Sequence, residues 1–203
     1  MRSIEAKSFE HLGRLESLSE RNMREHLRLY AGYVRKFNEL LKKREALQHS
    51  PDNYAGADCE SLKVDLTYAL GAIKNHELYF EILGGMQRGK GAGPEGPLLK
   101  AIEADFRSFP PYGADLKPSA LLGRGWAWTA YDRDQGGLFN YSGAQNGIPV
   151  WNTQPILAID LYGHAYFYDF GANKASYVDA VVSALDWMKI GQRYEVAMES
   201  AGK

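Results

Sequence analysis

Residues 155 to 166 have the sequence Pro-Ile-Leu-Ala-Ile-Asp-Leu-Tyr-Gly-His-Ala-Tyr. The apolar, β-branched run at the start of this stretch predicts a buried strand that ends at Asp160. His164 follows four residues later, about where a helix could begin. A carboxylate buried at a strand end needs a strong partner, because an unpaired buried charge is costly. A metal ion, an arginine or lysine side chain, and a helix cap each meet that need.

Two long amphipathic helices are predicted before this stretch. Residues 19–47 carry apolar side chains at three- and four-residue steps, and Ser19 is a residue type that favours a helix N-cap. Residues 59–83 repeat the pattern and are followed by two glycines, which favour termination. The turn sequence at 49–53 joins the two segments, so an antiparallel helical hairpin is expected.

The glycine-rich segment 84–96 predicts a linker. A phosphate-binding loop is disfavoured there, because no strand precedes the glycines and the spacing of such loops is absent. We therefore predict an N-terminal helical hairpin domain at residues 1–86 and a C-terminal domain at residues 97–203. The leader, residues 1–17, has leucines spaced for a short helix that packs on the hairpin or on a partner.

The C-terminal domain is predicted to combine helices with a small sheet. Aromatic and β-branched runs bounded by Gly, Asn and Asp predict strands at 126–131, 138–141 and 155–160. Helical patterns occupy about 97–107, 115–122 and 176–200. The predicted fold class is α+β, with a long antiparallel α-hairpin followed by a C-terminal α/β domain that holds a three-stranded antiparallel sheet.

Composition limits the function classes. The chain has 24 Lys and Arg against 25 Asp and Glu, which favours neither a nucleic-acid nor a membrane partner. Its one cysteine, Cys59, excludes an internal disulfide. No apolar run approaches the ~20 residues of a membrane span, and the charged N-terminus lacks the apolar region of a signal peptide. A cytoplasmic protein is expected.

The chain has five histidines, and three of them share a pattern. His26 and His76 lie on the apolar faces of the two predicted helices, and His164 lies beside Asp160. A lone histidine on such a face is usually a hydrogen-bonded core residue. Three imidazoles and one carboxylate together suit a redox-active metal such as iron or manganese. The spacing indicates a shared site but identifies neither the metal nor the reaction.

Several motifs resemble those of the iron/manganese superoxide dismutase family, in the family's order, from about residue 18 to 190. They are Tyr33-Val34-Arg35-Lys36-Phe37-Asn38, Asn75-His76, Gly123-Arg124-Gly125-Trp126-Ala127-Trp128, Asp160-Leu161-Tyr162-Gly163-His164-Ala165-Tyr166 and the following Asp169 to Tyr177. The Asp-x-x-x-His-Ala-Tyr motif is highly specific.

The resemblance implies a function and a set of site residues. The implied metal ligands are His26, His76, Asp160 and His164, around one iron or manganese ion per subunit. Tyr33 is implied at the entrance for superoxide, Trp126 in an apolar wall, and Lys174 in place of a family arginine. The implied reaction converts two superoxide ions and two protons to dioxygen and hydrogen peroxide, as the metal alternates between two oxidation states. A homodimer is also implied.

The surroundings of the implied site depart from the family. Iron enzymes supply a glutamine four residues before the Asn-His histidine, where this chain has Ala72. Manganese enzymes supply it from the loop before the last strand, which favours Gln145 here, with Asn146 as the alternative. Gly163 replaces a glutamate that reaches across the family's dimer, so the case for that dimer is weaker.

Further substitutions surround these positions. Tyr30 stands four residues after His26, where many members have histidine, and serves either a polar role or the core. Tyr162 replaces tryptophan, and Lys74 precedes Asn75. Together these changes leave two functions open. The chain is a superoxide dismutase, or it is a metal-binding, weakly active or non-catalytic relative with a structural or partner-binding role. The presence of all four ligands favours the enzyme.

Overall fold

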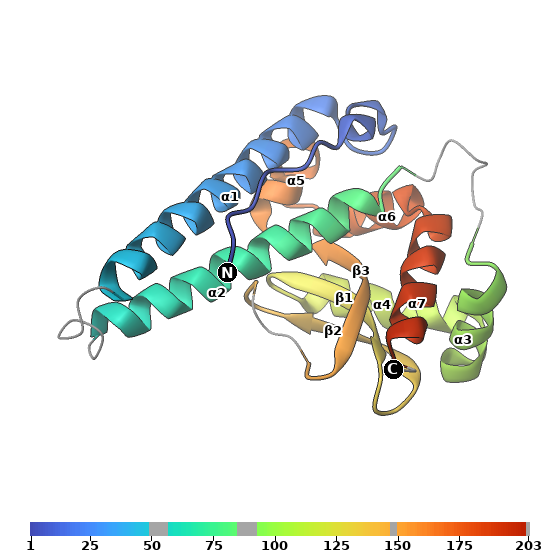
Figure 1. The fold of residues 1–203 in the computed structure, drawn as a ribbon. Helices are drawn as coiled ribbons and strands as arrows, with labels where there is room; N and C mark the ends of the chain where they lie inside the picture. The colour runs from blue at the N-terminus through green and yellow to red at the C-terminus, as the bar shows by residue number, and fades with distance from the viewer. Residues whose placement is uncertain (49–56, 85–92, 147–149, 202–203) are drawn as a thin grey trace.

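The computed structural model describes residues 1–48, 57–84, 93–146 and 150–201. These residues form seven α-helices, one short 3-10 helix and a three-stranded antiparallel sheet. Figure 1 shows two long helices side by side, with the sheet and the remaining helices packed beside one half of the pair. The predicted α+β fold is therefore confirmed.

The long pair consists of α1 (Glu20–Gln48) and α2 (Ala57–Glu81). Ser19 caps α1 as expected, since its Oγ accepts a hydrogen bond of 3.1 Å from the backbone N–H of Asn22. The apolar stripe of α1 is buried against α2, and the side chains of Met23, Tyr30 and Phe37 are each 1% exposed. The predicted turn at 49–53 lies outside the described residues, as do residues 85–92 of the predicted linker.

The leader packs on the hairpin. It forms a 3-10 helix, η1 (Glu10–Arg14), and the side chain of Leu12 is fully buried. Upstream of η1, the amide of Asn38 in α1 pairs with both backbone groups of Ile4, at 3.0 and 2.9 Å. Lys7 forms an ion pair of 2.5 Å with Glu77 of α2. Of the two placements expected for residues 1–17, the structure shows packing on the hairpin.

The sheet has the order β2-β1-β3, with β1 (Trp126–Asp132) in the centre between β2 (Gly137–Gly143) and β3 (Thr153–Asp160). Its strands extend the predicted segments by a few residues. The register places Asp160 opposite Trp126. Residues 156–159 of β3 are fully buried, so Asp160 enters the core at the end of an apolar strand.

Five further helices surround the sheet and the hairpin: α3 (Gly96–Phe106), α4 (Phe109–Leu122), α5 (Gly163–Phe170), α6 (Lys174–Ala184) and α7 (Trp187–Ala201). The predicted helix at 115–122 begins six residues earlier, with prolines in its first turn, where no backbone N–H is needed. The predicted helix at 176–200 is two helices, because Leu185 is extended and ends α6.

The end of α2 joins the C-terminal half of the chain through backbone hydrogen bonds. Leu83 forms an isolated β-bridge with Leu185, and Gly84, at φ +103°, donates a hydrogen bond of 2.9 Å to Ala184. The division into domains at 1–86 and 97–203 stays a prediction. Within the described parts of the chain, no helix combines the length and apolarity needed to cross a bilayer.

Candidate metal centre

Four side chains from four elements meet where the hairpin packs on the sheet. His26 projects from α1, His76 from α2, Asp160 from the end of β3 and His164 from the first turn of α5. The turn between β3 and α5 is held by the acid itself, since the backbone N–H of Tyr162 donates a hydrogen bond of 2.9 Å to Asp160 Oδ1. This leaves Oδ2 to face the three histidines.

The distances within this cluster match a metal site. The Nε2 atoms of His26 and His164 each lie 3.1 Å from Asp160 Oδ2, and that of His76 lies 3.4 Å from it. The four candidate ligand atoms are all within 4.8 Å of one another. Two ligand atoms about 2.1 Å from one ion, at angles of about 95–110°, are separated by about 3.1–3.4 Å. The four residues therefore fit around a single ion.

An unpaired atom also points to an ion. His76 is 1% exposed, and its Nδ1 hydrogen bonds to the Ala72 carbonyl oxygen at 2.6 Å, which makes Nδ1 the protonated nitrogen. Its Nε2 therefore carries a lone pair, and this buried atom has no hydrogen-bond partner among the described residues. Buried polar atoms are rarely left without a partner, whereas a metal ion accepts such a lone pair.

Burial sets the charges of the cluster. It lowers the pKa of His76 to about 3 and also lowers the pKa of His26, so both imidazoles are neutral near pH 7. Burial alone raises the pKa of Asp160, but hydrogen bonds from His164 and His26 outweigh it, and the pKa lies below its ordinary value. His26 and His76 are thus neutral imidazoles beside an ionised carboxylate, the protonation state that metal binding requires of these groups.

Tyr33 and Trp126 flank His76. The ring of Tyr33 lies 5.5 Å from that of His76, and the ring of Trp126 meets it edge-on at 5.1 Å. Trp126 is fully buried, and its indole Nε1 donates a hydrogen bond of 2.7 Å to Asn146 Oδ1. The structure thus brings both predicted residues to the cluster.

Two residues in the loop before β3, Gln145 and Asn146, were expected as sources of an amide near the cluster. Gln145 is exposed, whereas Asn146 is 4% exposed, and its Nδ2 is buried without a hydrogen-bond partner in the described part of the chain. Asn75, beside His76, holds the loop by donating a hydrogen bond of 3.0 Å to the Asn146 carbonyl oxygen. Of the two positions, Asn146 is buried and Gln145 is exposed, so the structure favours the alternative, Asn146, over Gln145, and the role of this amide stays a prediction.

The sequence of this chain is similar to those of several known proteins. A sequence model described as "Iron/manganese superoxide dismutases, C-terminal domain" matches residues 94–193. A superoxide dismutase [Fe] of Aquifex aeolicus is 32% identical over 191 residues, which cover 92% of this chain and 88% of the relative. A superoxide dismutase [Mn] 1 of Halobacterium salinarum is 31% identical over 171 residues, which cover 84% of this chain and 82% of the relative.

This chain belongs to the iron/manganese superoxide dismutase family. The resemblance carried by its motifs is confirmed. A further relative, the superoxide dismutase [Fe] of Cupriavidus metallidurans, is 31% identical over 140 residues, 68% of each chain. These relatives carry iron in some cases and manganese in another, so the names alone do not assign one metal to this chain.

The departures from the family pattern have definite places in the structure. Tyr30 is 1% exposed and its hydroxyl donates a hydrogen bond of 2.8 Å to Glu77. Its ring therefore packs in the core, and its buried hydroxyl has a hydrogen-bond partner. Lys174 donates hydrogen bonds to the carbonyl oxygens of Leu121 and Gly123, so its ammonium group holds the end of α4. Gly163 is exposed, and a Cβ added there would meet no described atom within 4 Å.

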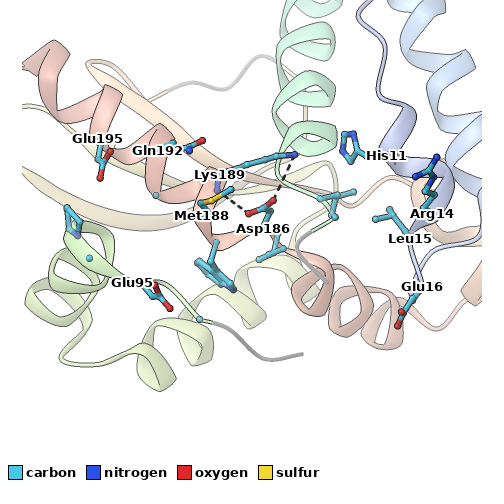
Figure 2. A pocket seen from close by; sticks show the side chains of 18 residues that line it. His11, Arg14, Leu15, Glu16, Glu95, Asp186, Met188, Lys189, Gln192 and Glu195 are labelled. Atoms are coloured by element: carbon cyan, nitrogen blue, oxygen red, sulfur yellow. Dashed lines mark hydrogen bonds and ion pairs between the residues drawn. The ribbon is translucent and has the colours of Figure 1, made fainter. Parts of the chain in front are cut away.

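The metal cluster is separate from a large surface cleft. This cleft of about 930 Å³ lies between η1, the start of α3 and α7, and none of the four cluster residues lines it. Figure 2 shows His11 and Arg14 on one side of the cleft and Asp186, paired with Lys189 at 4.0 Å, on the other. The cluster is instead enclosed, with the side chain of His164 at 28% as its most exposed part.

Sequence reasoning did not find two residues near the cluster. Tyr68 in α2 has its ring 6.3 Å from that of Tyr33. Tyr162, noted only as a replacement for tryptophan, stacks on His164 with ring centroids 5.5 Å apart. The place of Tyr68, eight residues before His76 and two helical turns away on the same face, is the signal that could have found it.

Proposed function

We propose that this protein is a superoxide dismutase with one iron or manganese ion at the cluster. The observation that supports the proposal best is the convergence of three imidazole nitrogens on one carboxylate oxygen, at 3.1 to 3.4 Å, with the lone pair of His76 unpaired. Membership of the family supplies the reaction. When bound, the ion supplies an oxidation state that changes by one electron.

In this proposal the protein's residues fix the ligand set and its charge. His26, His76 and His164 contribute imidazole nitrogens, and Asp160 contributes the negative charge of the ligand set. Asp160 is also held through its backbone, because the Tyr177 hydroxyl donates a hydrogen bond of 2.6 Å to the backbone carbonyl oxygen of Asp160. An anionic ligand lowers the net charge of the site and shifts the reduction potential of a bound ion.

Three neighbouring side chains would control access and protons. Asn146 presents its unpaired Nδ2–H groups as donors toward the site, and Trp126 fixes the amide by holding Oδ1. Tyr33 is half-buried and packs against the ring of His76, which is consistent with an entrance residue. The burial of the cluster favours a small substrate, and superoxide is a small substrate.

The test combines metal analysis with an activity assay on one purified sample. We expect near-stoichiometric iron or manganese by mass spectrometry together with superoxide dismutation, and loss of both in His76→Ala. His11→Gln is the matched control, because His11 is outside the cluster and bonds the Phe80 carbonyl oxygen. Bound metal without activity would support the non-catalytic alternative, and absence of metal after reconstitution would refute the proposal.

The cytoplasmic location and the homodimer stay predictions. The homodimer rests on the family resemblance, and the glutamate expected to support it is replaced by Gly163.

A further inference from the structure

The leader is tied to both long helices close to the metal cluster. The backbone N–H of Lys7 donates a hydrogen bond of 3.0 Å to the Tyr30 hydroxyl, which in turn donates one of 2.8 Å to Glu77. The ammonium group of Lys7 pairs with the same carboxylate at 2.5 Å and so closes a ring of three contacts. Tyr30 lies one helical turn after His26. Glu77 directly follows His76, so the leader is fixed where the hairpin carries its two cluster histidines.

This attachment places Phe9 on the rings that surround the cluster. The half-buried ring of Phe9 has its centroid 5.2 Å from that of Phe80 and 6.0 Å from that of Tyr30. Phe80 is fully buried, and its ring meets that of His26 edge-on at 5.0 Å and lies 5.8 Å from that of His76. A leader residue therefore packs on the ring that contacts two of the four cluster residues.

This packing matters most for His26, because its second nitrogen has no partner. The Nε2 of His26 faces the cluster, and its buried Nδ1 has no hydrogen-bond partner among the described residues. The ring of His76, by contrast, is held by the bond from its Nδ1 to the Ala72 carbonyl oxygen. Such a bond is the usual means of fixing an imidazole that binds a metal. The orientation of His26 is thus left to the surrounding rings, and outside the cluster these are Phe80, at 5.0 Å, and Tyr79, at 5.5 Å.

We propose that Phe9 is a positioning residue of the metal centre, which holds Phe80 against His26 and thereby strengthens metal binding. The proposal rests on the proposed function for the presence of a metal ion at the cluster. Without the Phe9 ring, Phe80 has room to move, and His26 can turn away from the orientation that an ion requires. Changes to residues that orient a metal ligand lower metal affinity by about 10–100-fold. We expect about tenfold here, because Phe9 acts through one intervening ring.

The first test is urea unfolding of each variant with and without excess Mn²⁺. It separates the stability of the apoprotein from the factor by which the ion lowers the unfolding equilibrium constant, and that factor follows the affinity for the ion. Phe9→Ala should reduce the factor about tenfold, and Phe9→Leu, which keeps much of the apolar volume, should restore most of it. An unchanged factor in Phe9→Ala would overturn the proposal.

Two further variants distinguish positioning from a general loss of stability. Ile4→Ala is the matched control, because Ile4 is also half-buried in the leader but is not one of the rings around His26. It should lower the stability of the apoprotein and leave the effect of Mn²⁺ unchanged. In a Phe80→Leu background, Phe9→Ala should no longer reduce the effect of Mn²⁺. An equal loss in Ile4→Ala, or an undiminished effect of Phe9→Ala in the Phe80→Leu background, would overturn the proposal.

The second test follows the leader itself. Coupling between two sites is reciprocal, so a bound ion should hold the leader in place by the same factor. The amide proton of Lys7, bonded to the Tyr30 hydroxyl, exchanges with solvent when the leader lifts from the hairpin. Mn²⁺ should slow the exchange of the peptide that contains Lys7, measured by mass spectrometry, by up to about tenfold in the wild type and not in Phe9→Ala. Equal slowing in the two proteins, or none in the wild type, would contradict the coupling.

The same samples distinguish this proposal from the proposed function. A wild type that responds to Mn²⁺ or Fe²⁺ in the unfolding assay but does not dismutate superoxide would refute the proposed reaction and leave the role of Phe9 intact. A wild type whose unfolding responds to neither ion would overturn both.

Discussion

Replacement of His76 by phenylalanine should stabilise the apoprotein while removing its response to metal. The ring of His76 is surrounded by those of Tyr33, Phe80 and Trp126, with centroids 5.5, 5.8 and 5.1 Å away. A phenyl ring suits this environment. His76→Phe also removes Nε2, a buried atom without a hydrogen-bond partner among the described residues.

The magnitude follows from two opposing contributions. A buried polar atom without a partner costs about 1–3 kcal/mol, so its removal stabilises the folded apoprotein by that amount. The bond from Nδ1 to the Ala72 carbonyl oxygen is lost, at about 1 kcal/mol. That oxygen lies inside α2 and keeps its helical backbone donor, so it is not left unpaired. The net gain is about 1 kcal/mol, or about 2–4 °C in Tm for a chain of this size.

Metal should stabilise the wild type much more than His76→Phe. An ion at one thousand times its Kd stabilises the wild type by about 4 kcal/mol, and His76→Phe should lose most of this gain. Urea unfolding with and without Mn²⁺ or Fe²⁺ measures both quantities. His11→Phe is the control, because it removes a bond to the Phe80 carbonyl oxygen but no cluster residue. An apoprotein destabilised by more than about 1 kcal/mol, or an undiminished response to metal, would refute the reasoning.

Three further predictions concern pH, association and helix capping. Because burial lowers the pKa of His76 from 6.5 to about 3, the unfolded chain binds a proton that the folded chain does not, and apoprotein stability should fall below pH 6.5. His76 contributes a slope of about 1.4 kcal/mol per pH unit in urea unfolding, to which His26 adds because burial also lowers its pKa, and an equal slope in His76→Phe would contradict the contribution of His76. Gly163→Glu should fold normally, because the added Cβ meets no described atom within 4 Å and the position begins α5, where a negative charge is favoured. If this glutamate supports the family's dimer, light scattering should show a shift toward twice the chain mass, and an unchanged mass speaks against that role. Asp169→Ala removes the carboxylate oxygens that accept hydrogen bonds from the backbone N–H and the hydroxyl of Ser19, at 2.8 and 2.6 Å, and should lower the free energy of unfolding by about 1 kcal/mol. Asp179→Ala removes a carboxylate of an exposed ion pair and should change the free energy of unfolding little.

The helices and strands were predictable because their apolar residues recur at regular spacings. The apolar steps of 19–47 and the capping serine predicted α1 to within one residue at each end. The run before Asp160 predicted a buried strand, and the pairing with β1 places that acid opposite Trp126. A helix or a strand fixes the direction of each side chain from its neighbours, so the sequence alone sufficed to place His26 and His76 on the inner faces of their helices.

Residues in irregular segments could not be placed in this way. Between β2 and β3 no period tells which side chain turns inward, and the structure buries Asn146 and leaves Gln145 exposed. The break at Leu185, which divides the predicted last helix, follows from contacts with Leu83, a residue far away in the sequence. Such contacts are decided by tertiary packing and leave no local pattern.

The metal ligands and the aromatic residues around them are held in different ways. His26, His76 and Asp160 are at most 1% exposed on elements whose directions are set by long periods, so a change in any ligand alters the core. Tyr68, whose ring lies 6.3 Å from that of Tyr33, is outside the ligand set and 37% exposed. Its hydroxyl can be removed without altering the core. A change at Tyr68 should therefore leave metal binding intact, whereas His76→Phe removes a ligand, and metal analysis of Tyr68→Phe and His76→Phe tests that separation directly.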